Sequence, residues 1–185
     1  MIVQKVAPIQ TDIDSILSLD EAKRFIRVID TEDDLDIQSF INSAIAEAQD
    51  ITNRQFATAT YELYLSEFKR EIKLPKNPIQ EIISIEYLDS SNNYIALDSN
   101  SYFLYENLEI GTIIFKTIPG IRVEKKAVKI TFKSGYVSNF PADLKQWLKV
   151  RVSTLYEYRE ELTAGVSISK NNHVDSILQR YRIRS

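Results

Sequence analysis

The feature that most constrains the fold is a change of hydrophobic period near Thr60 that reverses near Pro141. Before Thr60, apolar residues recur every three or four positions, which predicts helices. Between residues 59 and 135, short β-branched and aromatic runs alternate with turn residues, which predicts antiparallel strands. The helical spacing returns after Pro141. The pattern therefore predicts an α+β fold, in which a small bundle of three main helices carries an antiparallel β module inserted between the second and third helices.

The first helical segment, residues 18–55, is predicted to form a hairpin of two helices. Ser18 and Glu21 have the S-x-x-E spacing of a capping box, which marks the start of the first helix. The second helix is predicted from about Asp33 to Thr52. Its apolar stripe consists of Ile37, Phe40, Ile41, Ala44, Ile45, Ala48 and Ile51. Residues 1–17 have no clear period and are predicted to be an irregular lead-in.

The acidic cluster at residues 30–34 precedes this second helix. Negative charge there complements the positive end of the helix dipole. No calcium-loop spacing or closing glutamate accompanies the cluster, so we interpret it as a capping and solubilising element.

The C-terminal part is predicted to contain a long helix over residues 141–162 and a flexible tail over residues 163–185. Pro141 is expected at the first helical position, where its missing N–H does no harm. Within the tail, a short helix is predicted from Val174 to Tyr181. We expect the 185 residues to form one domain.

Composition excludes several classes of protein. The chain has no cysteine, which excludes disulfides and thiolate metal sites. Its apolar runs are shorter than the roughly 20 residues that span a bilayer, and residues 1–5 lack a signal-peptide pattern. These features predict a soluble, cytoplasmic protein without a membrane partner. The formal net charge is −3, made up of +3 for residues 141–185 and −6 for the preceding 140. Such an uneven distribution is compatible with attraction between neighbouring copies, and equally with ordinary variation among solvated charges.

The sequence offers few groups for catalysis. His173 is the only histidine and has no partner at metal-ligand spacing, and no two of the four glycines are close enough to cradle a phosphate. We therefore predict no catalytic, cofactor or metal site and no enzyme activity. Carboxylate pairs such as Glu160 with Glu161, or Asp33 with Asp36, leave a small hydrolase as an alternative.

Several segments, in order, resemble the phage head–tail connector (adaptor) family. Residues 74–89 read LPKNPIQEIISIEYLD, similar to the family's L-P-x-x-P segment and the strand after it. Residues 128–136 read VKITFKSGY, similar to its last strand. Residues 155–160 read LYEYRE, and residues 174–182 resemble its C-terminal D-x-h-L-x-x-Y-R signature, in which h is hydrophobic. The hairpin at residues 90–93 reads Ser-Ser-Asn-Asn where the family often has Asp-Gly. The prolines of the first segment are expected to lock an extended entry into the sheet, and Gly135 to occupy a place that a side chain would block.

The resemblance implies a structural protein that forms a ring beneath the portal of a long-tailed phage or prophage. The implied partners are the portal protein, neighbouring copies in a twelvefold ring, and a stopper or tail-completion protein, with DNA passing through the channel without sequence-specific binding. The C-terminal segment is expected to dock on the portal and to be disordered in the isolated subunit. The residues expected to make that contact are Val174, Ile177, Leu178, Tyr181 and Arg182. Tyr156 and Arg159 are expected at a subunit interface or at the edge of the core. A stopper or another neck ring remains an alternative.

Overall fold

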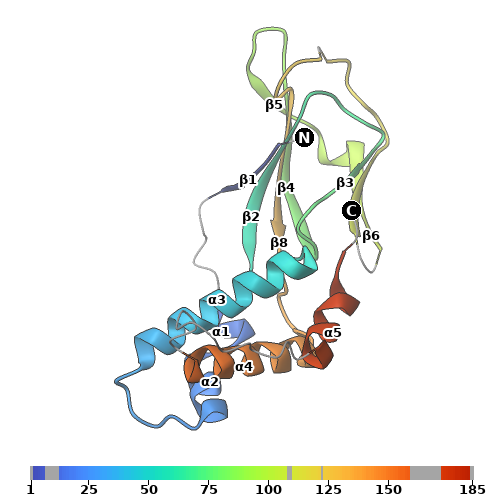
Figure 1. The fold of residues 1–185 in the computed structure, drawn as a ribbon. Coiled ribbons are helices and arrows are strands. Elements are labelled where there is room, and N and C mark those ends of the chain that lie inside the picture. The colour runs from blue at the N-terminus through green and yellow to red at the C-terminus, as the bar shows by residue number, and fades with distance from the viewer. Residues whose placement is uncertain (1, 7–12, 108–109, 122, 159–171, 184–185) are drawn as a thin grey trace. The chain divides into compact units, whose positions relative to one another are not determined.

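The computed structural model describes residues 2–6, 13–107, 110–121, 123–158 and 172–183. These residues fall into two compact units. The β unit comprises Met1–Thr11 and Ala57–Val137, and the helical unit comprises Asp12–Phe56 and Ser138–Ser185. Helices and antiparallel strands are both present (Figure 1), so the predicted α+β class is confirmed.

The β unit contains two antiparallel sheets. The five-stranded sheet has the order β1-β2-β8-β4-β5, and the three-stranded sheet has the order β3-β7-β6. The strands are β1 (Ile2–Val6), β2 (Ala59–Leu65), β3 (Glu71–Lys73), β4 (Ile79–Leu88), β5 (Tyr94–Ala96), β6 (Tyr102–Asn107), β7 (Ile110–Phe115) and β8 (Val128–Ser134). A 3-10 turn, η1 (Ser99–Ser101), precedes β6.

Strand β8 is the centre of the five-stranded sheet. It pairs with β2 on one side and with β4 on the other, so it has no free edge. Its burial alternates strictly, with Val128, Ile130 and Phe132 fully buried. Each such side chain stabilises the fold by roughly 1.5 to 3 kcal/mol relative to an exposed one. Aromatic contacts extend this core, since the rings of Tyr61 and Phe132 stack with centroids 5.7 Å apart.

The segment that leads into β4 is held by buried polar contacts. The side chain of Asn77 donates to the carbonyl of Leu74 at 3.0 Å and accepts from the amide of Gly111 at 2.7 Å. Lys76 has a positive φ of 63°, so residues 75–78 bend where an extended entry was expected. The carboxamide of Asn77 thus satisfies backbone groups that an extended segment would pair in a sheet.

The helical unit contains α1 (Ile13–Ile16), α2 (Leu19–Ile26), α3 (Asp34–Thr52), α4 (Ala142–Glu157) and α5 (Asn172–Tyr181). Helix α3 contacts α2, α4 and α5, and α4 also contacts α2 and α5. The stripe predicted for the second helix supplies buried residues of α3, namely Ile37, Ile41, Ala44, Ile45 and Ala48. The helical core is completed by residues of α2 and α4, namely Ala22, Leu144, Trp147, Leu148 and Val152.

Several expectations about local structure were wrong. Residues 2–6 form β1, which pairs with β2, and residues 13–16 form a short helix followed by the buried Leu17. The strands of the β module divide into two sheets, which the sequence pattern did not specify. Pro141 occupies the N-cap position, with ψ of 128°, and not the first helical position.

Helix α4 ends at Glu157, and the rest of the helix expected to reach residue 162 lies outside the described residues.

Candidate functional site

The C-terminal helix α5 carries most of the residues expected to dock on a partner. The structure describes the helix itself, but the side chain of Val174 lies outside the described residues. Leu178 is only 1% exposed, whereas Ile177 and Tyr181 are partly buried and Arg182 is exposed. The expected docking residues therefore differ in exposure: Leu178 lies inside the helical unit, whereas Arg182, which directly follows α5, is open to solvent.

Polar contacts fasten the end of α5 to the rest of the helical unit. The Tyr181 hydroxyl donates to Oδ1 of Asp143 at 2.7 Å, and Arg180 lies 3.2 Å from Oδ2 of the same carboxylate. Nε of Arg54 donates to the carbonyl of Tyr181 at 2.5 Å. The amide of Ile183 donates to the carbonyl of Thr52 at 2.9 Å. These contacts satisfy backbone groups at the ends of α3 and α5, so the end of α5 is anchored to the helical unit, whereas disorder was expected for the isolated subunit.

Tyr156 joins the end of α4 to the start of α3. Its hydroxyl donates to Oδ2 of Asp33 at 2.6 Å, and the side chain is partly buried. Asp33 occupies the N-cap position of α3 but makes no side-chain capping bond there. The acidic residue thus receives a tyrosine hydroxyl where a backbone amide was expected. Arg159, the other residue expected at this edge, lies outside the described residues.

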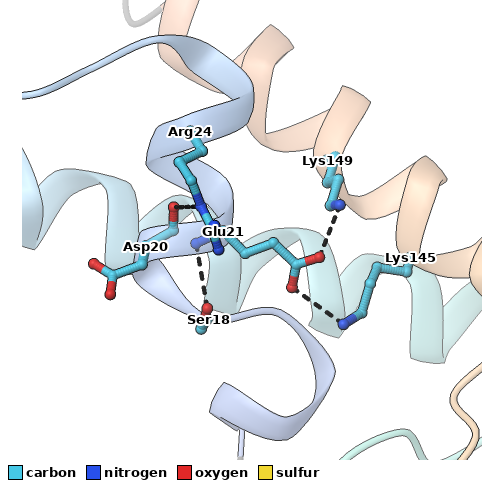
Figure 2. Close-up of polar contacts among 6 residues, drawn as sticks. All are labelled: Ser18, Asp20, Glu21, Arg24, Lys145 and Lys149. Atoms are coloured by element: carbon cyan, nitrogen blue, oxygen red, sulfur yellow. Dashed lines mark hydrogen bonds and ion pairs between the residues drawn. The ribbon is translucent and has the colours of Figure 1, made fainter.

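A charged cluster between α2 and α4 was not predicted. Glu21 was expected to complete a capping box with Ser18, and Ser18 does accept a hydrogen bond from the Glu21 amide at 3.2 Å. The Glu21 carboxylate turns instead to α4 (Figure 2), where Lys145 lies 3.1 Å away and Lys149 2.8 Å away. The i, i+4 spacing of the two lysines on one helix was the available signal, because it places both on one face.

The electrostatics of this cluster favour the charged form of Glu21. Partial burial alone raises the pKa of its carboxyl, but the hydrogen bonds and charges of Lys149 and Lys145 outweigh that effect and lower the pKa below its ordinary value. A carboxylate in this state does not donate protons at neutral pH. The cluster is a structural tie between two helices rather than a general acid.

A second ion pair fixes the connection between α2 and α3. Nζ of Lys23 lies 2.5 Å from Oδ1 of Asp34 and donates to the carbonyl of Asp30 at 2.6 Å. One member of the acidic cluster is thereby neutralised, and the loop between the helices is held at its base.

The face of the five-stranded sheet opposite to the core side chains carries a polar network. The Tyr64 hydroxyl donates to Glu62 at 2.6 Å, which together with burial and neighbouring carboxylates raises the pKa of Tyr64 to about 12. Lys129 lies 2.5 Å from Glu86, and that hydrogen bond raises the pKa of its ammonium group. The Tyr64–Glu62 bond lies within β2, whereas the Lys129–Glu86 pair joins β8 to β4 and stabilises the register between these two strands.

The described part of the chain contains neither a metal site nor a membrane-spanning helix. Within it, no group of three or more histidine, cysteine, aspartate or glutamate side chains is placed to hold a metal ion. Within the same residues, no helix is long and apolar enough to cross a membrane.

Comparisons with known proteins add a family and a set of similar folds. A family model described as "Head completion protein" matches residues 15–184, which include parts of both units. A comparison with curated proteins found no match.

Three solved structures share the fold over the full length of the chain. A chain in the neck of an empty GTA particle computed with C6 symmetry is 19% identical, with a TM-score of 0.81. A chain in the virion of a native gene transfer agent (GTA) particle is 20% identical, with a TM-score of 0.79. A chain in the neck of a native GTA particle computed with C12 symmetry is 18% identical, with a TM-score of 0.73. Each match covers 100% of this chain and 97% of the other.

Proposed function

Because this chain belongs to the head completion protein family, we propose that it is a structural subunit of a ring that joins the head of a phage-like particle to its tail. The observation that carries the proposal is the extent of the family match, which runs from residue 15 to residue 184. The matched range contains α2 to α5 and β2 to β8, so the resemblance is not confined to a common supersecondary motif.

The proposed ring is cyclic and beneath the portal, with the DNA channel continuing through it. The C6 and C12 symmetries used for the necks of similar fold support a ring of six or twelve copies. A cyclic ring needs a heterologous interface, in which two different surfaces of each subunit meet. The uneven distribution of charge along the sequence suits such an interface, because complementary surfaces steer neighbours together. The ring would assemble in the host cytoplasm and reside in the virion neck.

We further propose that α5 contacts the portal through its exposed face. Arg182, directly after α5, is exposed and Ile177 is partly exposed, whereas the buried Leu178 and the anchored Tyr181 position the helix. Removing residues 166–185 is a poor test of this proposal, because it also removes Leu178 and Ile183 from the helical unit. A variant that changes only the exposed face, Arg182→Glu, separates docking from folding.

Light scattering of the chain alone and with its cognate portal tests the proposed role. We expect a stoichiometric complex of many subunits, and weaker portal binding by Arg182→Glu with an unchanged melting temperature. The matched control is Arg70→Glu, which makes the same change of charge at an exposed residue of the β unit. A chain that associates with tail proteins and ignores the portal would instead be a stopper or tail-completion ring.

A further inference from the structure

Two exposed patches on different units of the chain have complementary character. The hairpin tip, residues 28–36, comprises the end of the connection from α2 and the first residues of α3, and it belongs to the helical unit. The basic loop, residues 116–126, connects β7 to β8 and belongs to the β unit. We propose that the hairpin tip of one copy binds the basic loop of the next copy around the ring.

The hairpin tip has the composition of an interface with an apolar centre and a charged rim. Ile29 is 94% exposed and Leu35 is 87% exposed, although the burial of such apolar side chains is favourable. Five of the nine residues are acidic and none is basic. Asp34 is paired with Lys23 and Asp33 accepts the Tyr156 hydroxyl, so these two are already engaged. Among the carboxylates, Asp30, Glu32 and Asp36 are exposed at the rim.

The basic loop offers the opposite charge around its own apolar side chains. Val123 is 68% exposed and Ile118 is 42% exposed. Among the described residues of this loop, three are lysines and one is an acid, Glu124. Lys116, Lys125 and Lys126 are exposed, and Lys126 lies 4.6 Å from the ring centroid of Tyr64, which holds it against the sheet.

The opposite charges of the two patches indicate that the partner is a second copy of the chain. They also indicate a heterologous interface, in which the tip of one copy meets the loop of the next. Two hairpin tips repel one another, and so do two basic loops, so neither patch is self-complementary. A tip and a loop attract and bring two apolar pairs together, which matches the apolar core and polar rim of a protein interface. Arg24 and Arg27 precede the tip and partly offset its negative charge. The exposed carboxylates that follow them in the chain are therefore the groups expected to attract the basic loop.

Charge reversal in the full chain tests the pairing. The tip variant is Asp30→Lys with Glu32→Lys, and the loop variant is Lys116→Glu with Lys125→Glu. We expect each variant alone to associate with itself about tenfold more weakly than the wild type. An equimolar mixture of the two should regain assembly, because reversed tips then meet reversed loops and unchanged tips meet unchanged loops. The matched control is Lys69→Glu with Arg70→Glu, which makes the same change in charge at exposed residues of the β unit outside the loop.

Chemical cross-linking locates the contact directly. The chain has no cysteine, so introduced thiols are the only ones present. A mixture of Ile29→Cys and Val123→Cys chains treated with a short bis-maleimide should yield a mixed dimer. Ile29→Cys mixed with Val137→Cys, a residue 76% exposed, should yield much less. If the wild type is monomeric alone, the same mixtures are cross-linked with the portal present.

This inference rests on the proposed ring, and the two fail in different ways. A wild-type chain that forms no complex with itself or the portal defeats the proposed function. A wild-type ring with no enrichment of the Ile29–Val123 link over the Val137 control, or a mixture of reversed variants that does not regain assembly, overturns the tip-to-loop contact alone.

Discussion

The hydroxyl of Tyr156, near the end of α4, donates a 2.6 Å hydrogen bond to Asp33, at the start of α3. The two residues are 123 positions apart in the chain. Since the acceptor is a carboxylate at a helix N-terminus, the contact ties two helices together at the place where the helix dipole also favours negative charge.

Replacing this tyrosine with phenylalanine removes the hydroxyl that donates to Asp33. We expect Tyr156→Phe to lower the free energy of unfolding by about 1 kcal/mol. Urea unfolding followed by fluorescence of Trp147, the single tryptophan, measures the change in the helical unit. The control is Tyr158→Phe at a side chain 48% exposed. Equal stability of both variants would mean that the bond to Asp33 contributes no net stability, because water binds the Tyr156 hydroxyl equally well in the unfolded chain.

The pairing of Glu21 with two lysines predicts a pH-dependent contribution to stability. A carboxyl whose pKa is lowered by folding stabilises the protein above its unfolded pKa, near 4.5, and this contribution is lost as the pH falls through the folded pKa. We expect Glu21→Gln to destabilise the helical unit by about 0.5 to 1 kcal/mol at neutral pH. The difference from the wild type, measured by urea unfolding at a series of pH values, should shrink as the pH falls below that unfolded pKa. If the difference in free energy of unfolding stays constant at acidic pH, the charge of Glu21 is not its cause. The destabilisation would then come from how the glutamine side chain packs.

Gly135 is expected to be irreplaceable by alanine. Its φ is +121°, and a Cβ there would lie 2.7 Å from the carbonyl oxygen of Ala57, a backbone atom that cannot turn away. We expect Gly135→Ala to destabilise the β unit by more than about 3 kcal/mol, since a clash adds to the backbone strain. The companion variant Gly120→Ala places its Cβ where no atom lies within 4 Å. Thermal melting followed by circular dichroism compares them, and similar melting temperatures would contradict the close approach.

Tyr64 is expected to ionise late in an alkaline titration. Its hydrogen bond to Glu62 raises the pKa to about 12, so its tyrosinate absorbance should appear well above that of exposed tyrosines. A tyrosine pKa raised by folding stabilises the protein below its unfolded pKa and loses that effect as the pH rises through the folded one. The difference spectrum between wild type and Tyr64→Phe isolates this group. Glu62→Gln should shift the step towards the ordinary value of 10. An unshifted step in Glu62→Gln would assign the effect to burial.

Periodicity predicted most of the elements because it reflects local burial. The stripe from Ile37 to Ala48 marks the buried face of α3, and the alternation at Val128, Ile130 and Phe132 marks the buried face of β8. The missed elements lack that signal. Strand β1 reads Ile-Val-Gln-Lys-Val without alternation, and it is defined by main-chain pairing with β2. The division into two sheets depends on long-range pairing that no local pattern encodes.

The candidate sites were less predictable than the fold. The family resemblance predicted a docking role for residues 174–182, but it did not distinguish the buried Leu178 from the exposed Arg182. Glu21 matched a local motif, yet its carboxylate binds lysines more than 120 positions away. The capping-box motif predicts a backbone partner within the same helix. In the folded chain, lysine side chains from another helix carry a full positive charge and bind the carboxylate instead.

The central place of β8 has a consequence for synthesis. Strands β2 and β4 both pair with residues 128–134, so a ribosome must deliver more than two-thirds of the chain before the five-stranded sheet forms. The helical unit can be completed only after a longer stretch has been synthesised. Helix α4 supplies the buried Trp147 and both lysines that bind Glu21. Long-range pairing of this kind leaves apolar segments uncovered while translation proceeds. A prematurely terminated chain would lack the central strand of its sheet and helix α4 of its bundle. Such a chain could not fold, so we expect it to be degraded before it is incorporated into a particle.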